Sequence, residues 1–178
     1  FPKNAHIKAN DIEIVSPREN RVIYSGDMAC AQMPLCPEFF IRASKAEILL
    51  LSSFDLISDA QVLSQRLSEV KAAINSYKNK KPFIFYEHAC FGNAAFEKLV
   101  QQELIPCIDL YSMNEDEFQT LAGQTVDLLD AESVLSCLYT VRSLFPHTSI
   151  MIHTSQWGLI LGEKAEKFAD SLQYAMLT

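Results

Sequence analysis

Short apolar runs alternate with amphipathic helical patterns along most of this chain, and that alternation limits its fold more than any other feature. Residues 48–51 and 83–86 are continuously apolar, as strands buried on both faces of a parallel sheet are. A helical pattern from Asp59 to Tyr77 separates them and places its apolar residues on one face. The same order continues with a predicted helix at about 93–103, a helix from Asp130 to about 145, and strands at 149–153 and 157–161. The sequence therefore predicts an α/β fold, a mostly parallel sheet with helices on both faces.

The N-terminal region has a different pattern. Residues 12–15 and 21–25 are short β-branched runs separated by Ser16-Pro17, which predicts two strands and a turn. We assign residues 1–26 to these strands and to the entry into the core, and residues 27–178 to the α/β core.

Charge and hydropathy exclude two classes of protein. A net charge of −7 argues against a nucleic-acid-binding surface, because no basic stripe offsets phosphate repulsion. No apolar run approaches the roughly 20 residues needed to span a bilayer, and no signal-peptide pattern is present. We expect a cytoplasmic protein. Because the chain starts at Phe1 and stops within a helical pattern, we also expect it to be a piece of a longer protein, or the ordered parts of one.

Residues 112–117, Ser-Met-Asn-Glu-Asp-Glu, carry the most polar groups next to a predicted strand. They follow an apolar run at 105–110 and precede a helical pattern, which predicts a strand end, a polar turn and a helix start. Right-handed crossovers place the turns after parallel strands on one edge of a sheet, and ligands bind at that edge. An oxygen-ligated magnesium ion would suit such a cluster. An acidic helix N-terminus, stabilised by the helix dipole, is the alternative.

Two further predicted turns reach the same edge, Ser52-Ser53 and Glu87-His88. Glu87 ends a strongly apolar strand, so it either pairs with Glu117 around a cation or emerges into solvent. His88 and His153 are candidate ligands or bases, or hydrogen-bonded structural residues.

Known phosphate loops and serine hydrolase motifs are not found in the chain. Its five glycines include no Gly-x-Gly, which excludes a Walker loop and a dinucleotide fingerprint within these residues. No Gly-x-Ser-x-Gly elbow occurs either.

Five motifs in one order resemble the ADP-dependent sugar kinases, the ADP-specific glucokinases and phosphofructokinases of archaea and animals, which have a ribokinase-like fold. The motifs are Asn20-Arg21-Val22-Ile23, Leu50-Leu51-Ser52, Phe85-Tyr86-Glu87-His88-Ala89, Ser112-Met113-Asn114-Glu115-Asp116-Glu117 and His153-Thr154. The resemblance spans residues from about 20 to about 161 and is strongest at 112–117. It implies transfer of the β-phosphoryl group of ADP to a sugar or sugar phosphate, giving AMP, in carbohydrate metabolism such as glycolysis. Part of a small β lid is implied for the N-terminal strands.

The resemblance also implies site residues. The family's Asn-x-x-Glu motif matches Asn114 and Glu117. Its glutamate acts on magnesium and the nucleotide phosphates, usually through waters, so the resemblance implies Glu117 at the metal with Asn114 alongside. The glutamate of its His-x-Glu motif matches Glu87, while Phe85 stands where the family has histidine. Since side chains alternate along a strand, His88 should point to the face opposite Glu87.

Nucleotide contacts are implied for three more residues: Arg21 at a phosphate, and His153 and Trp157 near the adenosine. The Gly-x-Gly-Asp motif that carries the family's catalytic base does not occur in these residues. Two alternatives stay open, an ATP-dependent ribokinase-like sugar kinase and a non-catalytic binding or scaffold domain of the same fold. The sequence identifies neither the sugar nor the oligomeric state.

Overall fold

The structure is a computed structural model that describes residues 2–17, 28–77 and 81–177. Its strands are β1 (His6–Ala9), β2 (Ile12–Val15), β3 (Ile48–Leu51), β4 (Phe83–Glu87), β5 (Leu110–Asn114), β6 (Ser149–His153) and β7 (Gly158–Leu161). Its helices are α1 (Met28–Gln32), α2 (Pro37–Ala43), α3 (Ala60–Ser76), α4 (Ala94–Glu103), α5 (Glu115–Ala122), α6 (Ala131–Leu144) and α7 (Ala165–Met176). Two short 3-10 helices, Phe54–Leu56 and Ile105–Cys107, precede α3 and β5.

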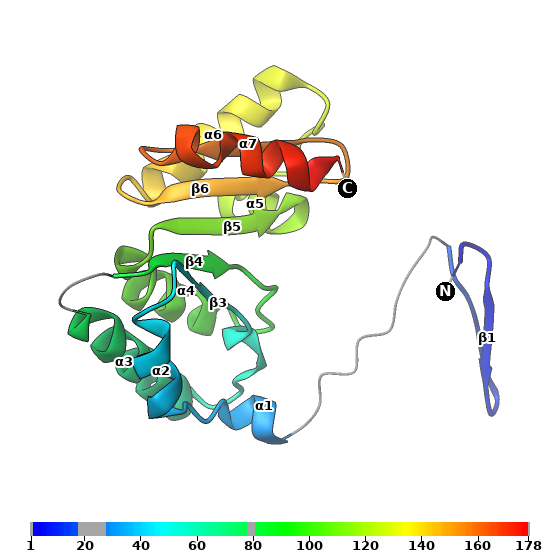
Figure 1. Cartoon of the computed structure of the whole chain (residues 1–178). Coiled ribbons are helices and arrows are strands. Elements are labelled where there is room, and N and C mark those ends of the chain that lie inside the picture. Colours follow the sequence, from blue (N-terminus) through cyan, green and yellow to red (C-terminus); the bar gives the residue numbers. More distant parts are fainter. Residues whose placement is uncertain (1, 18–27, 78–80, 178) are drawn as a thin grey trace.

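A five-stranded sheet in the order β3-β4-β5-β6-β7 forms the centre of the fold (Figure 1). The first four strands are parallel, and β7 returns antiparallel to β6. This confirms the predicted α/β fold with a mostly parallel sheet. Because β3 to β6 all run the same way, their carboxyl ends lie on one edge.

The two faces of this sheet are covered unequally. On one face, residues such as Ile84, Tyr111 and Ile150 are fully buried and share one apolar core with residues of α3, α4, α5 and α6. On the other face, α7 packs through Phe168, whose ring centroid lies 4.6 Å from that of Phe83. Helices therefore lie on both faces, as predicted, although α7 covers only part of its side.

Capping residues set the starts of the long helices. Asp59 accepts backbone N–H bonds from two residues of the first turn of α3, Asn93 accepts one at the start of α4, and Asp130 accepts one at the start of α6. A side-chain oxygen at this position satisfies amides that have no partner within the helix. The predicted helix starts at Asp59, Asn93 and Asp130 are confirmed.

The predicted strand at 105–110 and the polar turn after it were wrong in detail. Residues 105–107 form a 3-10 helix that contains Pro106, and β5 begins only at Leu110. Proline has no amide hydrogen to donate to a strand neighbour, which explains the late start. Ser112 and Met113 are buried within β5, and α5 begins at Glu115 directly after it. A strand and a helix therefore meet at Asn114 with no separate turn.

At the N-terminal end, β2 confirms the predicted strand at 12–15. Its partner is β1, in a separate two-stranded antiparallel sheet, and β1 was not predicted. The predicted strand at 21–25 lies outside the described residues, so the assignment of residues 1–26 to lid strands stays a prediction. Within the described ranges, no helix combines the length and the apolar character needed to cross a membrane.

Candidate functional site

Three residues predicted for the site end three neighbouring strands. Glu87 is the last residue of β4, Asn114 of β5 and His153 of β6. In the sheet register, Glu87 stands opposite Ser112, and Asn114 stands opposite His153. Side chains in register share a face. The topology thus brings these predicted residues to one edge of the sheet.

Glu87 and His153 contact each other directly. The imidazole Nε2 lies 3.0 Å from Oε1 of Glu87, which links the ends of β4 and β6 across β5. Both side chains are partly exposed, so other groups can still approach them. A neutral imidazole with its proton on Nε2 donates to the carboxylate, and a protonated one forms an ion pair. The Glu87 carboxylate thus has a partner in His153 and also reaches solvent.

Asn114 and Glu117 form a capping box at the start of α5. The Asn114 side-chain oxygen accepts the backbone N–H groups of Asp116 and Glu117, both at 2.9 Å. In return, Oε2 of Glu117 accepts the backbone N–H of Asn114 at 2.8 Å. Glu117 is only 8% exposed, so these bonds fix its carboxylate. Glu115 and Asp116 belong to the acidic first turn of the same helix.

The side-chain oxygens at this edge would suit a magnesium ion that keeps its waters. The described residues contain no group of three or more His, Cys, Asp or Glu placed to bind a metal directly. The side-chain oxygen of Asn114 is already engaged by two amides. Magnesium dehydrates reluctantly and is often held through one or two carboxylates with several waters. Glu87 and Glu117 offer two carboxylates at this edge of the sheet.

A buried hydroxyl stands opposite Glu87 in the sheet register. Ser112, opposite Glu87 in the register, is fully buried, and its Oγ has no hydrogen-bond partner among the described residues. Buried polar atoms are nearly always satisfied by protein or by ordered water.

The residues predicted near adenosine form a tight connection between β6 and β7. Oγ1 of Thr154 accepts the backbone N–H of Gln156 at 3.1 Å and that of Trp157 at 2.9 Å. The indole Nε1 of Trp157 donates to the Leu128 carbonyl at 2.8 Å. These bonds leave the indole partly buried and held in one orientation. Arg21, the predicted phosphate contact, lies outside the described residues.

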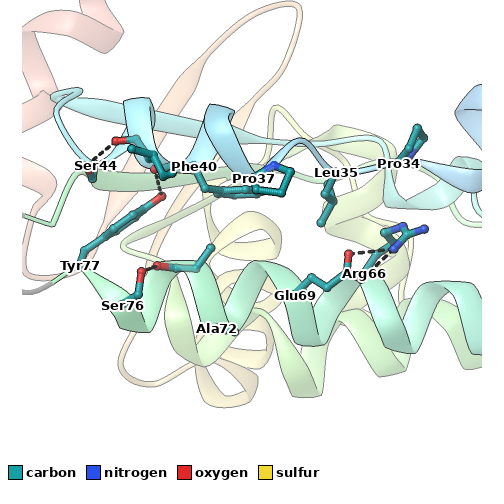
Figure 2. A pocket seen from close by; sticks show the side chains of 12 residues that line it. Pro34, Leu35, Pro37, Phe40, Ser44, Arg66, Glu69, Ala72, Ser76 and Tyr77 are labelled. Carbon is teal, nitrogen blue, oxygen red and sulfur yellow. Dashed lines mark hydrogen bonds and ion pairs between the residues drawn. The ribbon is translucent and has the colours of Figure 1, made fainter.

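Two cavities differ in their relation to these residues. One, of about 530 Å³, lies between α7 and the sheet and is lined by Glu87 and His153 together with apolar residues such as Phe85. A larger one, of about 930 Å³, lies between α2 and α3 and contains none of the predicted site residues (Figure 2).

Among the described residues that line the larger cavity, the charged side chains are Arg66 and Glu69, which pair with each other. The guanidinium of Arg66 donates to both oxygens of Glu69 and to the Gln32 carbonyl. The other walls of this cavity are mostly apolar, and the hydroxyl of Tyr77 donates to the Phe40 carbonyl at 3.2 Å (Figure 2). We therefore place the candidate site at the carboxyl edge of the sheet.

Comparison with protein families gave a match over nearly the whole chain. Residues 1–177 match the conserved region of ADP-specific phosphofructokinase/glucokinase. The chain belongs to the ADP-specific phosphofructokinase/glucokinase family. The family membership confirms the resemblance noted in the sequence. A comparison with curated proteins gave no match.

Solved structures of ADP-dependent kinases share the fold. A hypothetical ADP-dependent phosphofructokinase from Pyrococcus horikoshii OT3 is 18% identical with a TM-score of 0.55, and a phosphofructokinase from the same organism with AMP is 18% identical with a TM-score of 0.56. Each match covers 96% of this chain and 43% of the other. An ADP-dependent kinase in complex with fructose-6-phosphate and ADPβS is 13% identical with a TM-score of 0.61, over 90% of this chain and 39% of the other. The chain thus spans about two fifths of the length of these structures.

Several features of the site were not predicted. The Glu87–His153 contact joins residues that are 66 positions apart, and only the strand order brings them together. The capping box did have a sequence signal, since Asn at the cap with Glu three positions later fits the known pattern. The buried Ser112 hydroxyl had none, because the strand was expected to end before it.

Proposed function

We propose that the whole protein catalyses magnesium-dependent transfer of the β-phosphoryl group of ADP to a hydroxyl of glucose or fructose 6-phosphate, giving AMP and a sugar phosphate. The observation that carries the proposal is the fixed Glu117 carboxylate of the capping box, on the same sheet edge as Glu87, in a member of an ADP-specific kinase family. A bound magnesium ion would neutralise the charge that develops on the transferred phosphoryl group.

The residues of this chain would contribute positioning. Glu87 and Glu117 would hold the waters of the metal, and Asn114 would keep Glu117 in place through the two amide bonds of its side chain. His153 would orient the Glu87 carboxylate through Nε2. We propose that Trp157 lies near the adenosine and that Arg21 contacts a nucleotide phosphate, a task suited to a bidentate guanidinium. Phosphoryl transfer depends mainly on such positioning and on electrostatic stabilisation.

The test is an assay of the whole protein with Mg-ADP or Mg-ATP against a panel of sugars, beside Glu117→Gln. We expect wild-type protein to release AMP from ADP with one sugar, and Glu117→Gln to require more magnesium for the same rate, because the neutral amide attracts the hydrated cation less. If no sugar gives AMP from ADP, the proposed reaction fails. If Glu117→Gln equals the wild type at limiting magnesium, the site assignment fails.

The same assay separates the two alternatives. Product formed with ATP but not with ADP would indicate an ATP-dependent ribokinase-like sugar kinase. A non-catalytic domain is favoured by one observation, Phe85 at the position of the family histidine, and it would bind Mg-ADP without turnover.

A further inference from the structure

His88, the residue after Glu87, is held on the opposite face of the sheet by a buried polar network. The residue is 6% exposed. The imidazole Nδ1 lies 2.8 Å from the hydroxyl of Tyr111, and Nε2 lies 3.3 Å from Oε1 of Glu97. Tyr111 belongs to β5 and Glu97 to α4. One ring therefore ties the end of β4 to both neighbouring elements.

A hydrogen bond from Tyr111 orients the ring of His88. Burial raises the pKa of the Tyr111 phenol above its ordinary value, so the phenol keeps its proton. It can then donate to Nδ1 of His88. On the other side of the ring, Nε2 faces the Glu97 carboxylate, which accepts from the side-chain amide of Gln101 at 3.1 Å. Both ring nitrogens therefore have polar neighbours in a buried site.

The backbone connects this network to Glu87. The N–H of His88 donates to the Ser112 carbonyl at 2.8 Å, so pairing with β5 continues past the last residue of β4. Rings of Tyr86, Phe91 and Tyr111 enclose the imidazole, with centroids 6.4, 5.7 and 5.5 Å away. A strand end would otherwise be free to fray, because nothing follows it in the ladder. Here the residue directly after the carboxylate is anchored at both its main chain and its side chain.

We propose that His88 is a positioning residue, which sets the place of the Glu87 carboxylate for a hydrated divalent cation through its hydrogen bond to Tyr111 and its close contact with Glu97. The inference rests on the proposed function only in assigning Glu87 to the metal. His88 does not touch the cation, because it lies on the other face of the sheet. Residues that orient metal-binding groups in this way commonly change metal affinity or activity by about 10–100-fold when they are replaced.

The test compares four variants of the whole protein: His88→Leu, His88→Gln, Tyr111→Phe and His147→Leu. Leucine keeps much of the size of histidine and removes the polar contacts to Tyr111 and Glu97. Glutamine keeps one acceptor and one donor. Tyr111→Phe removes only the phenol partner. His147, exposed in the turn before β6, gives a matched change outside the network.

Two readouts are needed, Mn²⁺ binding in the presence of ADP by electron paramagnetic resonance and the magnesium concentration for half-maximal AMP release. We expect His88→Leu to weaken Mn²⁺ binding and to raise the half-saturating magnesium concentration about tenfold. His88→Gln should restore most of the Mn²⁺ binding and of the magnesium response, and His147→Leu should match the wild type in both readouts. A purely structural role would lower the melting temperature and kcat without moving either metal readout.

The outcomes distinguish this inference from the proposed reaction. Folded His88→Leu with wild-type Mn²⁺ binding, or His88→Gln as defective as His88→Leu, overturns the positioning role. If His88→Leu does not fold, Tyr111→Phe decides: weaker Mn²⁺ binding supports the role and unchanged binding refutes it. Wild-type protein that releases no AMP but binds Mn²⁺ in a His88-dependent way refutes the reaction and supports the role. Wild-type protein that binds no Mn²⁺ overturns it.

Discussion

Replacing Asn114 by alanine tests whether the capping box only stabilises the start of α5 or also holds the Glu117 carboxylate for the metal site. The side-chain oxygen accepts two amides at 2.9 Å. Asp116 is exposed, so its amide can turn to water, whereas Glu117 is buried and its amide loses its acceptor. Removal of such a cap costs about 1 kcal/mol of folding free energy, within a range of roughly 0.5–2. The start of α5 loosens, and with it the carboxylate of Glu117.

Asp59→Ala is the matched control. Asp59 caps α3 and also accepts two backbone amides, at 2.8 and 2.9 Å, but has no partner carboxylate in a capping box. Both variants should lose about 1 kcal/mol in urea unfolding followed by circular dichroism. Only Asn114→Ala should raise the half-saturating magnesium concentration for AMP release, by about tenfold.

Two results would refute this reasoning. Unchanged stability of Asn114→Ala would mean that the cap contributes nothing in solution. Equal magnesium dependence of the two variants would mean that the cap stabilises α5 without serving the metal site.

Two further predictions concern stability. Burial raises the pKa of Asp55 above its ordinary value of 3.8, partly offset by hydrogen bonds from the backbone amides of Asp55 and Leu56 and by nearby His88. The charged form is therefore disfavoured in the folded protein, so the free energy of unfolding falls as pH rises through the folded pKa. Asp55→Asn cannot ionise and should recover that stability. The melting temperature of Asp55→Asn should exceed that of the wild type at pH 7, and the difference should shrink toward acid pH. A difference that is equal at all pH values would contradict the assignment. Gly162→Ala should destabilise by more than about 2 kcal/mol, because its φ is +122° and a Cβ would lie 2.8 Å from Cα of Ser149. Gly123→Ala, with φ of +68° and open space, should cost less in the same urea unfolding measurement.

The sequence predicted the helix starts well because each depends on one residue with its own chemistry. Asp59, Asn93 and Asp130 satisfy orphan amides next to them in the chain, so the signal is local. The start of β5 was misplaced because residues 105–108 are apolar whether they form a strand or a 3-10 turn. Apolar runs without periodicity cannot distinguish the two.

Pairing between distant segments limited the prediction of the site. The residues at the strand ends were chosen from turn chemistry and from the family resemblance. The contacts between residues were not predicted, because the links from Glu87 to His153 and from His88 to Tyr111 depend on strand order and register. The opposite orientation of His88 was predicted, because alternation along a strand needs no knowledge of its neighbours.

The direct junction between β5 and α5 has a thermodynamic consequence for any ligand at this edge. Asn114 is both the last residue of the strand and the cap of the helix, so no loop separates the two elements. Ordering a flexible segment on binding costs about 1–2 kcal/mol per residue in backbone entropy. At this junction that cost was met when the chain folded. Binding free energy at Glu117 is therefore available for affinity instead of for ordering the protein.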